Sequence, residues 1–136
     1  MRMGLGLFLA VVAAGTAMAG AVFAGEVLLE VKVLKGQQVT IHLQPFLNED
    51  ELAMLRLVQT NKQALGLFVT STGGFAAMAV APDEGLVRDG GFPASVIAIG
   101  DLPDAGAAAA AALAGCEEKR GGGEPCVIVL EVGPQG

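Results

Sequence analysis

Residues 4–25 contain no charged side chain, and this run decides how much of the chain is left to form a folded domain. Arg2 precedes the run, and its most apolar part, from Leu5 to Ala14, has the length of the hydrophobic region of a secretory signal. Two endings suited to signal cleavage follow, one at Ala19 and one at Ala24. We therefore predict that the first 24 residues are a signal peptide, with cleavage after Ala19 or Ala24.

An uncleaved anchor is the alternative for the same run. Its 22 residues are long enough to cross the roughly 30 Å of hydrocarbon in a bilayer at about 1.5 Å per residue. Its many Ala and Gly residues make it a weak membrane span, and the small residues at the two cleavage sites favour cleavage. With either outcome residues 25–136 lie beyond the inner membrane, so we expect a periplasmic or secreted domain, or one anchored by residues 4–25.

The chain has 136 residues, and residues 25–136 suffice for a single domain with its own core. It carries 8 Lys and Arg against 14 Asp and Glu, and an acidic domain repels phosphate backbones. It has no Trp or Tyr that could stack on bases or sugars. We therefore expect no nucleic-acid partner, and membrane contact only through an uncleaved N-terminal segment.

Two alternating segments after this run predict a β-hairpin. Residues 26–34 alternate apolar and polar side chains, residues 38–44 do the same, and Lys35-Gly36 forms the turn between them. The alternation predicts that each strand directs its apolar side chains toward the core: Val27, Leu29, Val31 and Val33 from the first strand, and Val39, Ile41 and Leu43 from the second.

Asn48 begins the strongest helix signal in the chain. Glu51 stands three residues later, so the two side chains can form a capping box, and apolar residues recur after them at helical spacing. The pattern predicts a helix from about Glu49 to Asn61 or a few residues beyond.

The second half of the chain contains shorter segments whose patterns predict strands, turns and a second helix. Strands are predicted at 67–70, 75–81, 94–99 and 127–132, with turns at 82–85 and 88–91. Asp101 is predicted to begin a second helix, which contains eight Ala within residues 105–114. The predicted order is ββ-α-βββ-α-β, a small single α+β domain with two helices on an antiparallel or mixed sheet.

Cys116 and Cys126 lie between the Ala-rich helix and the last strand. Two cysteines in an exported domain predict a disulfide, which would fasten the helix to the strand. A redox pair and a metal site are the alternatives. The nine intervening residues disfavour a redox motif, and zinc needs four ligands where the chain has two Cys and one His.

His42 is the only histidine, so it is the first residue to test for catalysis. The alternation places it on the polar face of its strand, and no orienting partner can be assigned, which favours a solvated side chain. Ser71, Thr72 and Ser95 are candidate hydroxyl nucleophiles, but none lies in a G-x-S-x-G motif.

The acidic pairs and the methionines offer no clearer site. Glu49-Asp50-Glu51, Asp83-Glu84 and Glu117-Glu118 fall at a helix start, a turn and a helix end, where carboxylates are ordinarily solvated. Met54 and Met78 with His42 suggest a copper site, although methionines in apolar runs more often belong to a core. We predict no catalytic residue, no metal and no cofactor.

The C-terminal half resembles a family of small secreted or periplasmic proteobacterial domains that have an Ala-rich helix and a C-terminal Cys pair. The matching segments are residues 74–83, 107–116 and 126–129. The resemblance implies a disulfide-linked α+β module and implies no activity.

These patterns together predict a non-catalytic binding or structural module in the periplasm, with a protein partner in the cell envelope. Its apolar strands offer an edge for strand addition. The alternative is a small enzyme, or an accessory subunit of one, in which His42 is the residue to test.

Overall fold

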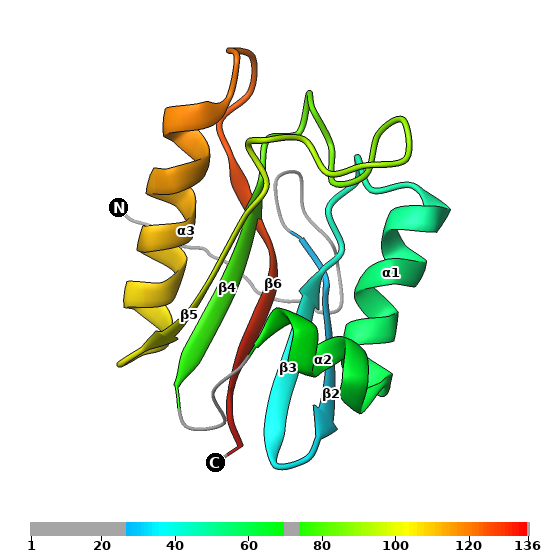
Figure 1. The fold of residues 1–136 in the computed structure, drawn as a ribbon, viewed down its shortest axis with the longest axis vertical. Coiled ribbons are helices and arrows are strands. Elements are labelled where there is room, and N and C mark those ends of the chain that lie inside the picture. Colours follow the sequence, from blue (N-terminus) through cyan, green and yellow to red (C-terminus); the bar gives the residue numbers. More distant parts are fainter. Residues whose placement is uncertain (1–26, 70–73, 136) are drawn as a thin grey trace, which may run out of the picture.

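The computed structural model describes residues 27–69 and 74–135, and these build a five-stranded sheet with helices on both faces (Figure 1). The strand order is β2-β3-β6-β4-β5, and every neighbouring pair is antiparallel. In chain order the elements are β2 (Leu29–Leu34), β3 (Gln37–His42), α1 (Glu49–Thr60), α2 (Lys62–Phe68), β4 (Phe75–Val80), β5 (Ile97–Leu102), α3 (Ala105–Lys119) and β6 (Val127–Pro134). The predicted α+β class is confirmed, while the predicted signal peptide lies outside the described residues.

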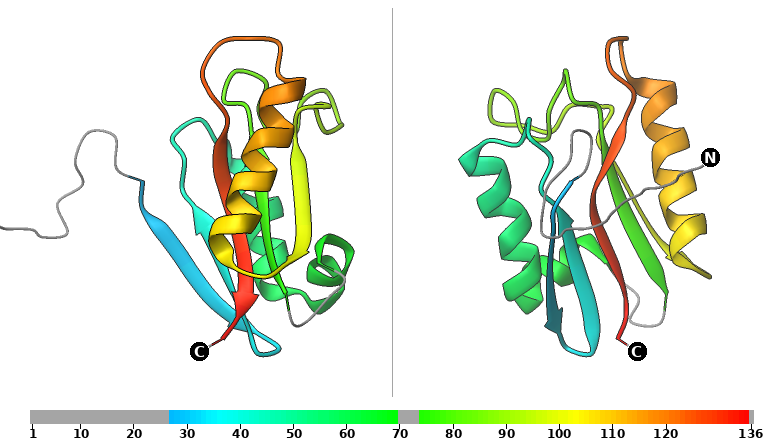
Figure 2. Two further views of the ribbon diagram at one scale, coloured as in Figure 1. Left: turned by 90° about the vertical axis from the view of Figure 1, so that its left-hand side faces the viewer. Right: turned by 180° about the vertical axis from the view of Figure 1, so that it is seen from behind.

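One face of the sheet packs against α1 and α2, and we call this side the α1 layer. Its buried side chains are mostly large aliphatics, among them Val39, Ile41, Leu55, Val58, Leu65, Met78, Leu130 and Val132. The other face packs against α3, which lies across β4, β5 and β6. The fully buried side chains of this α3 layer are small, among them Ala77, Ala79, Ala108 and Ala112, and larger side chains such as Ile97 and Leu113 pack around them partly buried. Figure 2 shows the two layers on opposite sides of the sheet.

The capping box predicted for α1 is present. The Asn48 side chain accepts from the Glu51 N–H at 2.8 Å, and the Glu51 side chain accepts from the Asn48 N–H at 3.0 Å. The helix ends at Thr60, because Asn61 takes an extended conformation and caps a second helix, α2.

A strand was predicted at residues 67–70, and this prediction is wrong for Leu67 and Phe68, which lie in α2. The Asn61 side chain accepts from the Ala64 N–H at 2.9 Å, so the chain re-enters a helix at once. A short apolar run does not distinguish a helix from a strand by its periodicity, and here the cap decides. The domain therefore has three described helices where two were predicted.

The Ala-rich helix starts later than predicted. The Asp104 side chain accepts from the Ala107 N–H at 2.7 Å and is the N-cap, whereas Asp101 still belongs to β5 and has a φ of 64°. β5 itself is shifted toward the C-terminus relative to the predicted 94–99, because the Val96 N–H donates to the Pro93 carbonyl and closes a turn there.

β2 presents its apolar side chains to the opposite face from the one predicted. The Lys35-Gly36 turn sets a register in which Val31 lies opposite Thr40, and such partners share a face. Thr40 points away from the α1 layer, so Leu29, Val31 and Val33 lie on the α3 side of the sheet. Each of them is about half exposed there, beyond the strands that α3 covers.

The connection from β4 to β5 contains both predicted turns. The Gly85 N–H donates to the Ala81 carbonyl at 2.8 Å, and Arg88 and Gly91 exchange backbone hydrogen bonds. The connection buries Leu86 in the α1 layer and leaves Phe92 on the surface beside α1 and α2.

Candidate functional site

His42 pairs with a carboxylate from the far end of the chain. Its Nε2 lies 2.8 Å from Glu131 Oε1, and both residues are on the open part of the α3 side of the sheet. The hydrogen bond from His42 lowers the pKa of Glu131, and this outweighs the opposing effect of partial burial. The expected polar face for His42 is therefore correct, but the side chain has an orienting partner that the sequence did not indicate.

A carboxylate that orients an imidazole is one part of an acid–base site, but the other parts are not assembled here. The cleft beside the pair, which Gln38, Thr40 and Glu131 help to line, has a volume of about 140 Å³. Ligand pockets ordinarily have volumes of roughly 300–1,000 Å³. Ser95 is fully buried and donates to Glu84 Oε1 at 2.5 Å, while Ser71 and Thr72 lie outside the described residues.

Met54 and Met78, for which a place in the core was favoured over a copper site with His42, lie on the other side of the sheet from His42. Met78 belongs to the α1 layer, and Met54 packs against the same core. His42 faces the α3 side, so the sheet separates the three side chains and they cannot share a metal.

Glu51 is fully buried, and its Oε2 accepts hydrogen bonds from the Leu86 N–H, the Val87 N–H and the Arg88 guanidinium at 2.6–2.9 Å. Burial acts to raise the pKa of Glu51, but the N–H groups of Asn48, Val87 and Leu86 and the charge of Arg88 outweigh it and lower the pKa. The carboxylate therefore ties the start of α1 to the β4–β5 connection, and it has no surface open to a ligand.

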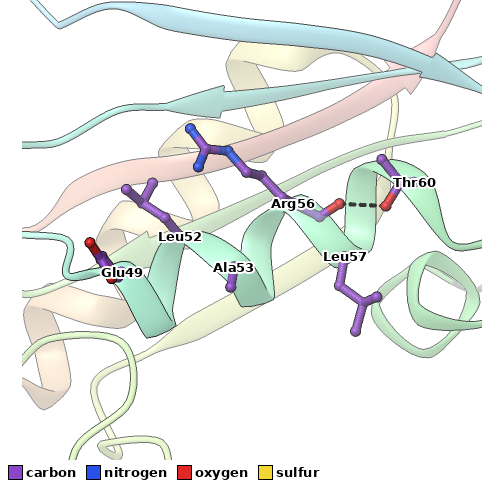
Figure 3. Close-up of a pocket in the computed structure, with 6 residues that line it drawn as sticks. All are labelled: Glu49, Leu52, Ala53, Arg56, Leu57 and Thr60. Carbon is purple, nitrogen blue, oxygen red and sulfur yellow. Dashed lines mark hydrogen bonds between the residues drawn. The ribbon is translucent and has the colours of Figure 1, made fainter.

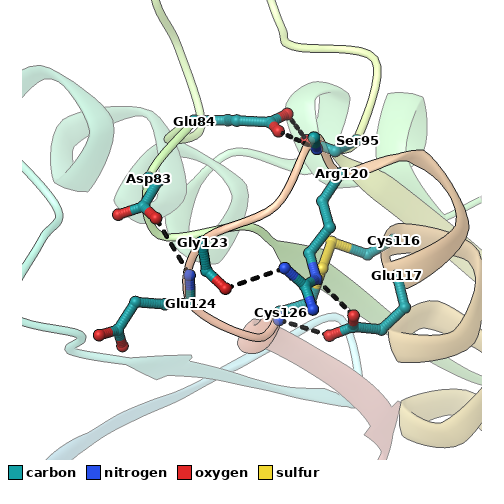
Figure 4. A network of polar contacts seen from close by, with 10 residues as sticks. Asp83, Glu84, Ser95, Cys116, Glu117, Arg120, Gly123, Glu124 and Cys126 are labelled. Atoms are coloured by element: carbon teal, nitrogen blue, oxygen red, sulfur yellow. Dashed lines mark hydrogen bonds and ion pairs between the residues drawn. A yellow bond between two sulfur atoms is a disulfide. The ribbon is translucent and has the colours of Figure 1, made fainter.

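The other acidic pairs bind the loop between the cysteines, as Figure 4 shows. Asp83 accepts from the Glu124 N–H at 3.0 Å, Glu84 from the Gly121 N–H at 2.7 Å, and Glu117 from the Cys126 N–H at 2.7 Å. These carboxylates satisfy backbone donors of a glycine-rich loop. In the described ranges, no three His, Cys, Asp or Glu side chains gather as metal ligands.

Cys116 and Cys126 form the predicted disulfide, with their Cα atoms 6.2 Å apart. The bridge joins the last turn of α3 to the residue before β6. A structural disulfide of this kind indicates an oxidising compartment. Among residues 27–69 and 74–135, no helix is long and apolar enough to cross a membrane.

A hollow on the outer side of α1 is a weak candidate site. Figure 3 shows that its lining residues, Glu49, Leu52, Ala53, Arg56, Leu57 and Thr60, all come from this one helix. A surface built by one helix has no opposing wall, so it cannot enclose a ligand.

A second hollow has walls from several elements and is the best candidate site in the described structure. It lies between α1 and α2, has a volume of about 380 Å³, and we call it the apolar hollow. Its lining residues are Met54, Leu57, Val58, Ala64, Leu67, Phe68, Met78 and Phe92. Each helix supplies three residues at i, i+3 and i+4, so one face of each helix borders the hollow.

The apolar hollow leaves large side chains in water. Leu67 is 89% exposed, Phe92 62% and Leu57 51%, although each comes from a different segment. No polar side chain lines the hollow. Clustered exposed apolar side chains of this kind mark interaction surfaces.

Sequence reasoning missed the apolar hollow for two reasons. Leu67 and Phe68 were assigned to a strand, which hid their helical spacing relative to Ala64. Phe92 lies in a turn-rich connection, and its closeness to α1 and α2 depends on tertiary contacts.

Comparison of the chain with protein-family models, with curated proteins and with solved structures gives no match. The resemblance of the C-terminal half to small exported proteobacterial domains therefore stays a prediction.

Proposed function

We propose that this protein is an exported, non-catalytic binding module that takes an apolar segment of a protein partner into the apolar hollow. The observation that carries the proposal is the convergence of exposed Leu57, Leu67 and Phe92 around one depression. Burying such side chains against a partner removes apolar area from water, and this is a main source of favourable free energy in association.

The lining of the apolar hollow argues for a protein segment rather than a small metabolite. Sites for small molecules place a few polar groups among the apolar ones to orient the ligand, and this lining contains none. Met54 and Met78 supply flexible side chains that can adapt to the shape of a partner. An apolar side of a partner helix, or two of its large side chains, fits a depression of about 380 Å³.

Export of the domain to the periplasm is part of the same proposal. The charge-free run of residues 4–25 and the Cys116–Cys126 bridge support it, since disulfides persist in oxidising compartments. The intact mass of protein recovered from a bacterial host, before and after reduction and alkylation, tests it. A mass that begins at Gly20 or Gly25 is expected, with alkylation only after reduction; a full-length mass would favour an inner-membrane anchor.

Site-specific photo-crosslinking tests the binding site. A photoreactive phenylalanine analogue at position 92, in protein expressed in its native envelope, should yield a discrete adduct with one envelope protein. The same analogue at Glu118, which is exposed on α3, is the matched control and should yield none. Mass spectrometry of the adduct identifies the partner.

A second variant keeps the crosslinking test decisive. Leu67→Glu places a charge in the apolar hollow at a side chain that is 89% exposed, so the fold should tolerate it. The adduct from position 92 should disappear while the melting temperature stays unchanged. Equal adducts from positions 92 and 118, or an adduct that survives Leu67→Glu, would reject the hollow as the binding site.

The contact of His42 Nε2 with Glu131 Oε1 favours one alternative, a small enzyme or an accessory subunit of one. Glu131 would orient the imidazole as a general base. Hydrolysis of chromogenic esters by the wild type, lost in His42→Ala without a change in melting temperature, would support this alternative. Absence of hydrolysis by the wild type would count against it.

A further inference from the structure

β2 is the end strand of the sheet, and within the described residues no strand pairs with its outer edge. In Figure 2 (left) β2 forms one margin of the sheet, and no described helix lies beyond it. An open strand edge carries a row of unpaired backbone donors and acceptors, which is a template for pairing with another strand.

The hydrogen bonds to β3 show which backbone groups are available. The Leu43 N–H donates to the Leu28 carbonyl at 2.9 Å, so Leu28 bonds toward β3. Backbone groups alternate in direction along an antiparallel strand. The N–H and C=O groups of Leu29, Val31 and Val33 therefore point to the outer edge.

The charges of β2 select one self-pairing register. When two copies of β2 run antiparallel about a two-fold axis at Val31, Glu30 of each copy lies opposite Lys32 of the other. The same register places Leu29 opposite Val33, and it pairs outward-pointing backbone groups with each other. A shift of the axis to Glu30 or to Lys32 places like charges directly opposite, which is destabilising.

The exposed apolar side chains favour the same arrangement. Leu29 is 56% exposed, and Val31 and Val33 are each 49% exposed. A two-fold axis perpendicular to the sheet keeps these three side chains of both copies on the α3 side of the sheet. The two copies therefore form one continuous apolar surface there. Lys32 has no ion pair within the described residues. Glu30 accepts two hydrogen bonds from the Arg56 guanidinium of its own chain, both at 3.0 Å, and in the dimer its carboxylate also faces Lys32 of the second copy.

We propose that the chain forms a two-fold symmetric dimer in which the β2 edges of two copies pair antiparallel about Val31 and join the two sheets into one. The occupant of the edge is thus a second copy of this chain. The opposite edge of the sheet is less suited to this role, because Asp101 interrupts β5 with a φ of 64°.

Crosslinking of single-cysteine additions tests the register. The native cysteines are joined in a disulfide, so a cysteine at position 31 supplies the only free thiol. Val31→Cys places this thiol opposite its own symmetry mate, roughly 5.5 Å away between Cα atoms. A short bismaleimide should therefore convert most of the protein into covalent dimer.

Val33→Cys is the matched control, because Val33 has the same exposed fraction of 49%. In the proposed register its symmetry mate lies four residues along the partner strand, roughly 13 Å away in that direction. A short reagent should give little dimer. Equal crosslinking of Val31→Cys and Val33→Cys would overturn the proposal, and so would a sedimentation mass of a monomer at every concentration.

Reversing the charge of Lys32 tests whether the pairing of Glu30 with Lys32 sets the register of the two β2 strands. Lys32→Glu places two carboxylates opposite each other at both ends of the pairing, and should weaken dimerisation roughly tenfold. Lys62→Glu makes the same change in net charge on α2 and should leave the dimer unaffected. Lys32→Glu protein that dimerises as tightly as the wild type would contradict the register, with melting temperatures of both variants measured as folding controls.

The dimer does not depend on the proposed binding function. The apolar hollow lies on the α1 side of the sheet, so Leu67→Glu should abolish partner crosslinking and leave the dimer intact. Each proposal can therefore fail alone.

Discussion

The two layers on either side of the sheet are stabilised in different ways. The α1 layer buries large aliphatic side chains completely, Leu55 and Leu130 among them, whereas α3 contributes mainly Ala108 and Ala112. Stabilisation by burial grows with the apolar area removed from water. Each residue of α3 therefore contributes less than a residue of α1, although its small side chains let the helix approach the sheet closely.

Covalent and polar contacts add to the packing of the small side chains in the α3 layer. The Cys116–Cys126 bridge ties α3 to β6, and Arg120 pairs with Glu117 and donates to the Gly123 carbonyl at 2.9 Å. The α1 layer has no such bridge in the described structure; it has the buried carboxylate of Glu51 instead. A helix of small residues is thus positioned by its attachments, and a helix of large residues by its packing.

The largest effect is expected from Leu55→Ala in the α1 layer. Loss of a fully buried leucine side chain should lower the free energy of unfolding by roughly 2–5 kcal/mol, because it removes apolar contacts and leaves a cavity. Leu57→Ala in the same helix, where the side chain is half exposed, should cost much less. Urea denaturation measures both, and equal losses would show that packing does not position α1.

Removal of the disulfide should have the next largest effect. Cys116→Ser with Cys126→Ser should lower the free energy of unfolding by about 3 kcal/mol, since the bridge no longer restricts the unfolded chain. Amide hydrogen exchange should show the greatest loss of protection in α3 and the start of β6. Unchanged protection of α3 would mean that its packing alone holds it against the sheet.

Ala112→Leu tests the close approach of α3 to the sheet. Ala112 is fully buried, so a larger side chain should force the helix outward and cost about 1–3 kcal/mol. Ala110→Leu, at an exposed position of the same helix, is the control and should be near neutral. A stabilised Ala112→Leu protein would reveal unfilled space in the α3 layer.

The smallest effect is the pH dependence that Glu51 contributes in the α1 layer. The pKa of Glu51 is lowered in the folded protein, so its ionised form contributes stability that is complete above the unfolded pKa and is lost as pH falls through the folded pKa. The difference in unfolding free energy between the wild type and Glu51→Gln should therefore shrink in acid. Urea midpoints between pH 7 and pH 3 measure it, and a constant difference would contradict the assignment.

Sequence patterns predicted correctly those contacts that form between residues close together in the chain. Asn48 and Glu51 predicted the capping box, and the turns at 82–85 and 88–91 are present. Cys116 and Cys126 predicted the bridge that the structure contains. Each of these contacts spans at most ten residues, so composition and spacing are enough to indicate it.

The sequence also contains the information that sets which face of the sheet the β2 valines take. That information lies in the length of the turn and not in the apolar alternation. Apolar alternation suggested that both strands of the hairpin face the core with their valines. The turn at Lys35-Gly36 forces Val31 opposite Thr40 instead, so the two apolar sets fall on opposite faces. Turn length, rather than alternation, decides the register of a hairpin.

Both candidate sites arise from contacts across long stretches of chain. Glu131 reaches His42 across 89 residues because β3 and β6 are neighbours in the sheet, and this strand order cannot be derived from local patterns. Phe92 joins Leu67 at the apolar hollow because the β4–β5 connection folds over α1. The residues alone therefore determined the capping box of α1, the turns and the disulfide. The sheet order decided which side chains meet, because strand pairing joins distant segments through backbone groups that every residue has.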